Sequence, residues 1–137
     1  MSSAQNVMFF RVRYSETDQM GTFYNSRALE WFECGRTELM REMGLPYSQM
    51  EERGVRLPLV EAHVEFLGRA KYDDELRQTT CAVMTGKARM RFEMTIEHAQ
   101  TGAAVAKGYT IHAVTDCNGK PIRPPQWFVD LFNQPQQ

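Results

Sequence analysis

One stretch of the sequence combines residues that could perform acyl-transfer chemistry. Asp18 lies in a turn that also contains Gly21, and a long amphipathic helix is expected to begin shortly afterwards, near Asn25 and Ser26. The first turn of a helix leaves backbone N–H groups without intrahelical acceptors and carries about half a unit of positive charge. A carboxylate beside such an end can stay ionised, and free N–H donors can hold a developing oxyanion. We therefore interpret residues 14–36 as a candidate acyl-transfer site.

The local pattern leaves two interpretations of Asp18 open. Asp and Gly are favoured in turns, so a purely structural role would also explain the residue. Alternatively, Asp18 activates water as a general base or attacks a carbonyl carbon itself. Glu16, two residues earlier, is expected to be structural. Gly21 is expected to permit a positive φ or a close approach of substrate to the backbone, and Tyr24 to lie in the core or line an acyl pocket.

Length and composition limit the class of protein. A chain of 137 residues with 42% hydrophobic and 24% charged residues predicts a single domain over residues 1–137. The formal net charge of −1 provides no field to attract nucleic acid or an anionic membrane. No apolar run reaches the roughly 20 residues that a membrane span needs, and residues 1–6 do not resemble a secretory signal. We expect a cytoplasmic protein.

The sequence gives little support for metal, cofactor or thiol chemistry. The three cysteines, Cys34, Cys81 and Cys117, are far apart, which favours a reducing compartment and no nucleophilic role. The three histidines, likewise, are not spaced as metal ligands, so no metal site is predicted. Because neither the G-x-x-x-x-G-K-[ST] nor the G-x-G-x-x-G motif occurs, no nucleotide cofactor is expected.

The long helix is predicted over residues 26–43. Its apolar positions recur on one face, Ser26 is a plausible N-cap, and Gly44 can end the helix. Gly35 lies within the apolar stripe, where it should cost about 1 kcal/mol relative to Ala, so we expect that it lets a strand approach closely. Arg36 lies in the same stripe and is expected to form a structural ion pair.

The remaining segments predict strands and two short helices. Alternation of apolar and polar residues is clearest over residues 90–97. Strands are expected at 7–14, 60–66, 76–84, 90–97 and 104–115, and short helices at 48–53 and 126–132. Tight turns between the last four strands imply antiparallel pairing. The pattern predicts an α+β architecture, with one long helix on a five-stranded antiparallel sheet whose edges invite pairing with a second copy.

An ordered set of motifs resembles one enzyme family. The set comprises RYSETDQMGTFY at residues 13–24, WFE at 31–33, RTE at 36–38, GL at 44–45, YDDEL at 72–76 and ARMRF at 88–92. In this order they resemble the hotdog-fold thioesterases of the 4-hydroxybenzoyl-CoA thioesterase family, and most closely the bacterial acyl-CoA thioesterase branch that includes the Tol-Pal-associated enzymes. The resemblance covers residues 10–125.

The resemblance implies a fold, an assembly and residue roles. A curved antiparallel sheet would wrap around the long helix, and active sites would lie at the interface of a homodimer or homotetramer. The family's catalytic carboxylate falls on Asp18, and its oxyanion N–H falls on Asn25, where relatives often carry Tyr or His. Arg89 falls in a region that contacts the nucleotide end of CoA in relatives.

The function expected from this resemblance is hydrolysis of an acyl-CoA or acyl-carrier-protein thioester. Two alternatives remain. A hotdog dehydratase would need a His before the helix, and none is present there. The second alternative is a protein that binds acyl-CoA without turnover.

Overall fold

The structure is a computed structural model in which residues 4–133 are described. Its elements, in chain order, are β1 (Ala4–Arg11), a 3-10 turn (Tyr14–Glu16), α1 (Arg27–Glu42), α2 (Tyr47–Glu52), β2 (Leu59–Phe66), β3 (Glu75–Met84), β4 (Arg89–His98), β5 (Ala104–Ala113) and α3 (Gln126–Phe132). Each expected helix and strand is present, with ends displaced by no more than a few residues.

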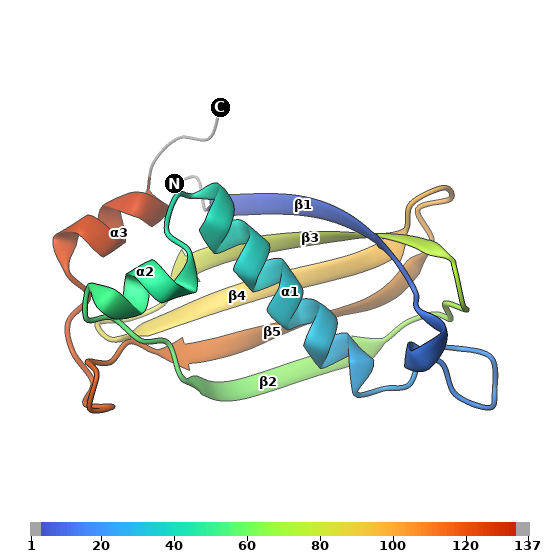
Figure 1. Cartoon of the computed structure of the whole chain (residues 1–137), viewed down its shortest axis with the longest axis horizontal. Helices are drawn as coiled ribbons and strands as arrows, with labels where there is room; N and C mark the ends of the chain where they lie inside the picture. The colour runs from blue at the N-terminus through green and yellow to red at the C-terminus, as the bar shows by residue number, and fades with distance from the viewer. Residues whose placement is uncertain (1–3, 134–137) are drawn as a thin grey trace.

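Five strands form one antiparallel sheet, and α1 lies diagonally across one of its faces (Figure 1). The strand order is β1-β3-β4-β5-β2. The expected α+β architecture, with one long helix on a five-stranded antiparallel sheet, is therefore confirmed. The last four strands do not all pair in sequence, however, because β2 crosses to the far edge and pairs with β5. The segment between β2 and β3 is consequently a crossover and not the tight turn that the sequence suggested.

Helix α1 forms where the apolar stripe predicted it. Phe32 and Leu39 are fully buried against the sheet, and Gly44, which has a φ of +84°, ends the helix as expected. Ser26 occupies the N-cap position, but its side chain makes no capping hydrogen bond. The start of α1 is therefore not closed by a side chain, which is relevant to the chemistry proposed for it.

Gly35 brings α1 close to β3, as predicted. A Cβ atom at Gly35 would lie 2.0 Å from Nε2 of Gln78 and 2.4 Å from Oγ1 of Thr80. Both side chains are buried on the inward face of β3, and Gln78 donates a hydrogen bond of 2.9 Å to the backbone carbonyl of Trp31. The inward polar pair also explains why β3 gave a weaker alternating pattern than β4.

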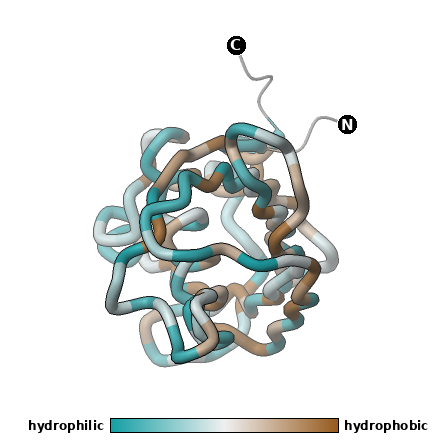
Figure 2. The backbone as a smooth tube through the Cα atoms, turned by 90° about the vertical axis from the view of Figure 1, so that its right-hand side faces the viewer, coloured by the Kyte–Doolittle hydropathy of each residue, from teal (hydrophilic) through white to brown (hydrophobic). Residues whose placement is uncertain are grey.

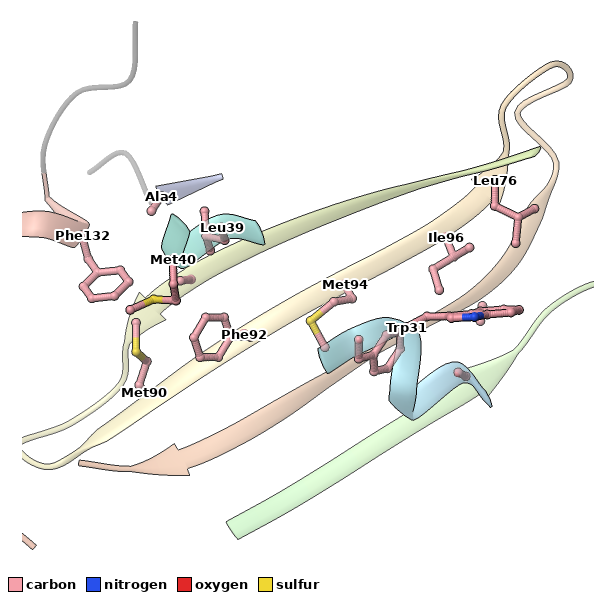
Figure 3. Close-up of a cluster of buried hydrophobic side chains, with 14 of the residues drawn as sticks. Ala4, Trp31, Leu39, Met40, Leu76, Met90, Phe92, Met94, Ile96 and Phe132 are labelled. Carbon is pink, nitrogen blue, oxygen red and sulfur yellow. The ribbon is translucent and has the colours of Figure 1, made fainter. Parts of the chain in front are cut away.

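The core lies between α1 and the sheet. Inward residues of β4, namely Met90, Phe92, Met94 and Ile96, are at most 1% exposed and project toward the helix side (Figure 3). Hydrophobic and hydrophilic segments alternate along the chain in the perpendicular view of Figure 2. Along β4 every second residue is buried, and residues two apart lie on the same face of a strand, so this burial pattern identifies the face of the sheet that packs on α1.

The edge strand β2 contrasts with β4. Nearly all of its residues are exposed in the single chain, including Val60 and Phe66, at 50% and 52% exposure. Within residues 4–133, no helix has both the length and the hydropathy to cross a membrane.

Candidate active site

The Asp18 carboxylate sits in a closed turn and uses only one of its oxygens there. Its Oδ1 accepts hydrogen bonds from the backbone N–H groups of Met20 at 2.9 Å and Thr22 at 3.3 Å. The Asp18 N–H donates to the carbonyl of Thr22 at 2.8 Å, and Gly21 takes a φ of +80°. Oδ2 takes part in none of the hydrogen bonds found among residues 4–133. The turn thus holds the carboxylate in place and leaves one oxygen for chemistry.

The start of α1 lies beside this turn. Residues Thr17 and Phe23 form an antiparallel bridge, and the Tyr24 N–H donates to the Glu16 carbonyl at 2.8 Å, so the chain returns alongside Asp18 just before the helix. The first helical hydrogen bonds come from Arg27 and from Ala28, which use the carbonyls of Tyr24 and Asn25.

These bonds leave two amides free for a ligand. Across the described part of the chain, the N–H groups of Asn25 and Ser26 have no hydrogen-bond acceptor, and both residues are exposed. Two unsatisfied donors at the positive end of a 16-residue helix are suited to an anionic oxygen.

Glu16 anchors the turn to the helix and is structural, as expected. Its carboxylate is 3% exposed and accepts hydrogen bonds from the Arg13 N–H at 2.7 Å and from Nε1 of Trp31 at 2.8 Å. Burial raises the pKa of Glu16. These hydrogen bonds and the charge of Arg13 lower the pKa, and together they outweigh the effect of burial, so the net shift is downward. A carboxylate already satisfied in this way is held in its ionised form and is not available as a base.

The other expected site residues lie at different distances from Asp18. Gly21 has the positive φ that was predicted. Tyr24 is 51% exposed, so its assignment to the core was wrong, while a role in lining a pocket stays a prediction. Arg89 begins β4, whose other end, His98, is bonded to Arg69 near the Asp18 turn. A ten-residue strand spans about 33 Å, so Arg89 and Asp18 are not brought together within one chain.

The expected ion pair of Arg36 is absent. Within residues 4–133 no carboxylate lies within salt-bridge distance of its guanidinium, and its buried Nε has no hydrogen-bond partner. Arg36 instead acts on Tyr47: burial raises the pKa of the Tyr47 phenol, and the positive charge of Arg36 opposes that shift. A neutral phenol therefore takes the place of the expected carboxylate.

The sequence did not predict any cavity at the far end of α1. A cavity of about 360 Å³ lies there, lined by residues that include Tyr47, Met50, Leu57, Pro58 and Thr115. Two others, of about 490 and 340 Å³, lie along α1 and share Glu16 and Cys34, and only the larger is also lined by residues of β1. None of these three cavities is lined by Asp18 or Asn25. Their lining residues come from separate segments, so no local pattern could have identified them.

Thiol and metal chemistry find no support in the geometry. Burial and the neighbouring Glu33 carboxylate raise the pKa of Cys34, which disfavours its thiolate. All three cysteines are free. His112 is buried and bonded to the Leu57 carbonyl and the Thr110 hydroxyl, and burial lowers its pKa. No cluster of three or more His, Cys, Asp and Glu side chains suited to a metal ion occurs in the described range.

Comparison with known proteins gives consistent matches. A protein of Aquifex aeolicus, provisionally named an esterase, is 31% identical over 124 residues, which are 89% of this chain and 93% of that protein. The Bacillus subtilis protein YneP, provisionally named an acyl-CoA thioesterase, is 47% identical over 55 residues, but the match spans only 40% of either chain. The crystal structure of a 1,4-dihydroxy-2-naphthoyl-CoA thioesterase from Synechocystis superposes with a TM-score of 0.87 at 19% identity, covering 96% of this chain and 99% of that one.

The family model of the Thioesterase-like superfamily matches residues 12–132, and this match includes the Asp18 turn and α1. Together with the Aquifex relative, it confirms the expected hotdog family and, at the level of the family, a thioester hydrolase. Assignment to the Tol-Pal-associated branch stays a prediction. This chain belongs to the Thioesterase-like superfamily.

Proposed function

We propose that this protein is an acyl-CoA thioesterase in which Asp18 and the start of α1 act on the same thioester carbonyl. The observation that carries the proposal is the pairing of one free carboxylate oxygen with two free amides on adjacent antiparallel segments. Membership of the superfamily and the naming of YneP support a thioester substrate.

In the proposed reaction, Oδ2 of Asp18 removes a proton from water as the water oxygen bonds to the thioester carbon. The carbonyl oxygen becomes an oxyanion that accepts a hydrogen bond from the Asn25 N–H. Collapse of this intermediate breaks the C–S bond, and the CoA thiolate takes the proton from Asp18. The products are a carboxylic acid and CoA.

Nucleophilic attack by Asp18 is the alternative route through the same geometry. Oδ2 would bond to the thioester carbon, CoA would leave, and water would then hydrolyse the acyl–Asp18 anhydride. Both routes need the free oxygen, and both use the Asn25 amide. Because the donor is a backbone group, an Asn side chain in place of the Tyr or His of relatives is compatible with either route.

Substrate binding is proposed to involve Gly21, Tyr24 and Arg89. Gly21 lets substrate approach the turn, the exposed Tyr24 ring covers the acyl group, and Arg89 meets a phosphate of CoA or of a carrier protein's pantetheine arm. Since Arg89 is remote from Asp18 within one chain, it would come from a second copy in a homodimer or homotetramer. The free, exposed thiols of Cys34 and Cys117 support a cytoplasmic setting.

The test is hydrolysis of short, long and aromatic acyl-CoAs by the wild type and Asp18→Asn. An amide keeps an oxygen acceptor for the Met20 and Thr22 amides, so the fold should be retained. We expect kcat/KM to fall by about 10²–10⁴-fold, the usual contribution of a general base. Retained hydrolysis by a folded Asp18→Asn variant would reject the role of Asp18. Hydration of an enoyl-CoA, or tight acyl-CoA binding without product, would identify one of the two alternative functions.

A further inference from the structure

The turn that carries Asp18 gains little support from packing. Its tip, Gln19, Met20 and Gly21, is exposed, and Asp18 itself is only partly buried. The hydrogen bonds inside the turn shape it, but they do not fix its place relative to the rest of the fold. A general base must lie within hydrogen-bond reach of the water it deprotonates, and a displacement of about 1 Å can cost roughly 10²-fold in rate. The contacts between the turn and its surroundings are therefore a second requirement of the proposed reaction.

Thr22 joins the turn to the segment between β2 and β3. Its N–H donates to Oδ1 of Asp18 at 3.3 Å, and its carbonyl accepts the Asp18 N–H at 2.8 Å. The Thr22 hydroxyl donates to the Ala70 carbonyl at 3.2 Å and accepts the Ala70 N–H at 3.1 Å. Ala70 is 1% exposed, so both of these hydrogen bonds are shielded from water. One residue thus couples the Asp18 carboxylate to a buried position of the backbone.

Two neighbouring contacts strengthen this attachment. The Phe23 N–H donates to the same Ala70 carbonyl at 2.9 Å, and the Phe23 ring packs on Trp31 of α1, with ring centroids 4.9 Å apart. At the exposed tip of the turn, the Arg69 guanidinium donates to the Met20 carbonyl. The turn is therefore held by a guanidinium at its tip and by a hydroxyl at its base, and the residue that follows the turn contacts α1.

The segment that receives these contacts is itself fixed to the sheet. The Gly68 N–H donates to the Val105 carbonyl at 3.1 Å. A Cβ atom at Gly68 would lie 2.3 Å from the Ala104 carbonyl oxygen, so the segment lies directly against β5. The Arg69 carbonyl is 2.8 Å from Nε2 of His98, at the end of β4. The sheet thus provides a firm base for the turn through contacts within a single chain.

We propose that Thr22 and Arg69 are positioning residues of the thioesterase reaction, which hold the Asp18 carboxylate beside the first amides of α1. This inference rests on the proposed function. Neither side chain contacts the thioester, and each acts through the turn that carries Asp18. Thr22 has the larger effect, because its side-chain hydrogen bonds are shielded from water and its backbone binds Asp18 directly, whereas Arg69 is exposed.

Steady-state hydrolysis of acyl-CoA by Thr22 variants tests the proposal, at a temperature where every variant is folded. Thr22→Val keeps the shape of the side chain and removes the hydroxyl, so kcat should fall by about 10–100-fold while KM changes little. Thr22→Ser restores the hydroxyl and should retain kcat within about threefold. Wild-type kcat in a folded Thr22→Val variant, or an equal loss in Thr22→Ser, would overturn the role of the hydroxyl.

Thr115→Val is the matched control. It also removes a buried hydroxyl that donates to a backbone carbonyl, that of Asp116 at 3.0 Å, but it does so in a turn that does not carry the proposed base. Its urea midpoint should fall while its kcat stays at the wild-type value. A loss of kcat in Thr115→Val as large as that in Thr22→Val would mean that general destabilisation accounts for both, and would overturn the inference.

A second background shows whether Thr22 acts through Asp18. In Asp18→Asn the group that Thr22 positions is already inactive, so adding Thr22→Val should lower the residual rate by less than about twofold. The same loss in both backgrounds would show that Thr22 acts independently of Asp18, and the inference would fail. Full activity of Asp18→Asn alone, in contrast, would reject the proposed function itself.

Arg69 provides a test that does not disturb a buried group. Arg69→Met should lower kcat by about 3–10-fold at unchanged KM, and Arg69→Lys should recover part of the rate, because its ammonium can still donate to the Met20 carbonyl. Lys71→Met is the control for charge, since Lys71 is also exposed and, in the described part of the chain, is not hydrogen-bonded to the turn. It should leave kcat unchanged. A rise in KM at wild-type kcat for Arg69→Met would mean that Arg69 binds substrate directly, and would overturn its positioning role.

Discussion

Two turns of this molecule have the same geometry and different surroundings. In each, an Asp Oδ1 accepts N–H groups two and four residues later: Met20 and Thr22 for Asp18, Asn118 and Lys120 for Asp116. In each, the Asp N–H also donates back across the turn, to the carbonyl four residues on.

The two glycines complete the likeness. Gly21 and Gly119 both lie three residues after the Asp and have φ values of +80° and +82°. The turns lie at opposite ends of β5, because the first is attached to the Phe66 end of β2 and the second comes after Ala113. The structural explanation therefore accounts for the turn contacts of Asp18, whose carboxylate accepts hydrogen bonds from backbone amides. The same explanation applies equally to Asp116.

The difference between the turns lies in the segment that comes next in the chain. The Asp18 turn leads into a 16-residue helix with two unsatisfied amides at its start, whereas the Asp116 turn leads to Pro121 and an extended segment. A carboxylate in a turn is thus not a catalytic feature by itself. In the proposed reaction the helix end supplies the donors for an oxyanion, and only the Asp18 turn is followed by a helix of this length.

The largest expected difference between the turns is catalytic. Asp18→Asn should lower kcat/KM for acyl-CoA by about 10²–10⁴-fold, while Asp116→Asn should leave it within about twofold, because only the Asp18 turn leads into the start of α1. Both variants keep the oxygen acceptor of the turn, so their midpoints of urea unfolding should be equal. Steady-state hydrolysis and urea titrations of the two variants check this. Equal loss of activity in both would show that the turn geometry, and not the helix end, accounts for the effect.

The sequence predicted the Asp18 turn and α1 because both depend on local signals. Gly21, Gly44 and the apolar stripe each act within a few residues, and α3 was placed at its observed bounds for the same reason. The sequence did not predict the pairing of β2 with β5. Period-two alternation shows which face of a strand is buried, but it does not show which strand lies next to it in the sheet.

The environment of Arg36 and the cavity were missed for a related reason. Arg36 required some polar neighbour, and its position in the apolar stripe favoured a carboxylate, but Tyr47 reaches it from a separate helix. The cavity is lined by residues from α2, the segment before β2 and the segment after β5. Such features depend on how distant segments pack together, and the spacing of residues within one segment does not reveal that packing.

The next largest effect concerns the helix that distinguishes the two turns. In Gly35→Ala the new Cβ would displace the Gln78 amide from the Trp31 carbonyl, which costs packing and a buried hydrogen bond. Ala has a higher helix propensity than Gly, which offsets part of this cost. We expect a net loss of about 2 kcal/mol in the free energy of unfolding. Urea titration measures it.

A second substitution provides the control for Gly35→Ala. Gln78→Ala makes room for the Cβ, so adding Gly35→Ala to it should cost much less than adding Gly35→Ala to the wild type. Equal costs in both backgrounds, or a more stable Gly35→Ala, would contradict the close approach of α1 to β3.

A smaller effect concerns Glu16, the buried link between the Asp18 turn and Trp31. At the corresponding position, two residues before Asp116, lies the apolar Val114, which cannot accept such hydrogen bonds. Glu16→Gln removes a charged acceptor from two short hydrogen bonds, which should cost about 1–3 kcal/mol at pH 7. The exposed Glu52, on α2, is the matched control, and Glu52→Gln should change the unfolding midpoint little.

The cost of Glu16→Gln should depend on pH with a defined sign. The pKa of Glu16 is lower in the folded protein than in the unfolded chain, so its stabilisation is complete above about pH 4.3, the unfolded value, and is lost as the pH falls through the folded value. Thermal unfolding of wild type and Glu16→Gln should therefore differ most near neutral pH and converge below about pH 4. A gap that widened as the pH fell would contradict the downward shift.

The smallest expected effect on stability concerns Gly21 and Gly119, the glycines of the two turns. Gly21→Ala and Gly119→Ala both force a Cβ into a left-handed φ, and neither Cβ would contact another atom within 4 Å. The costs in unfolding free energy should therefore be equal, at about 1–2 kcal/mol each, and Asn at either position should cost less, since Asn tolerates this conformation. Urea midpoints of the four variants measure this. A clear difference between the two Ala variants would mean that the turns are not energetically equivalent, and the contrast in their chemistry could then no longer be assigned to the helix end alone.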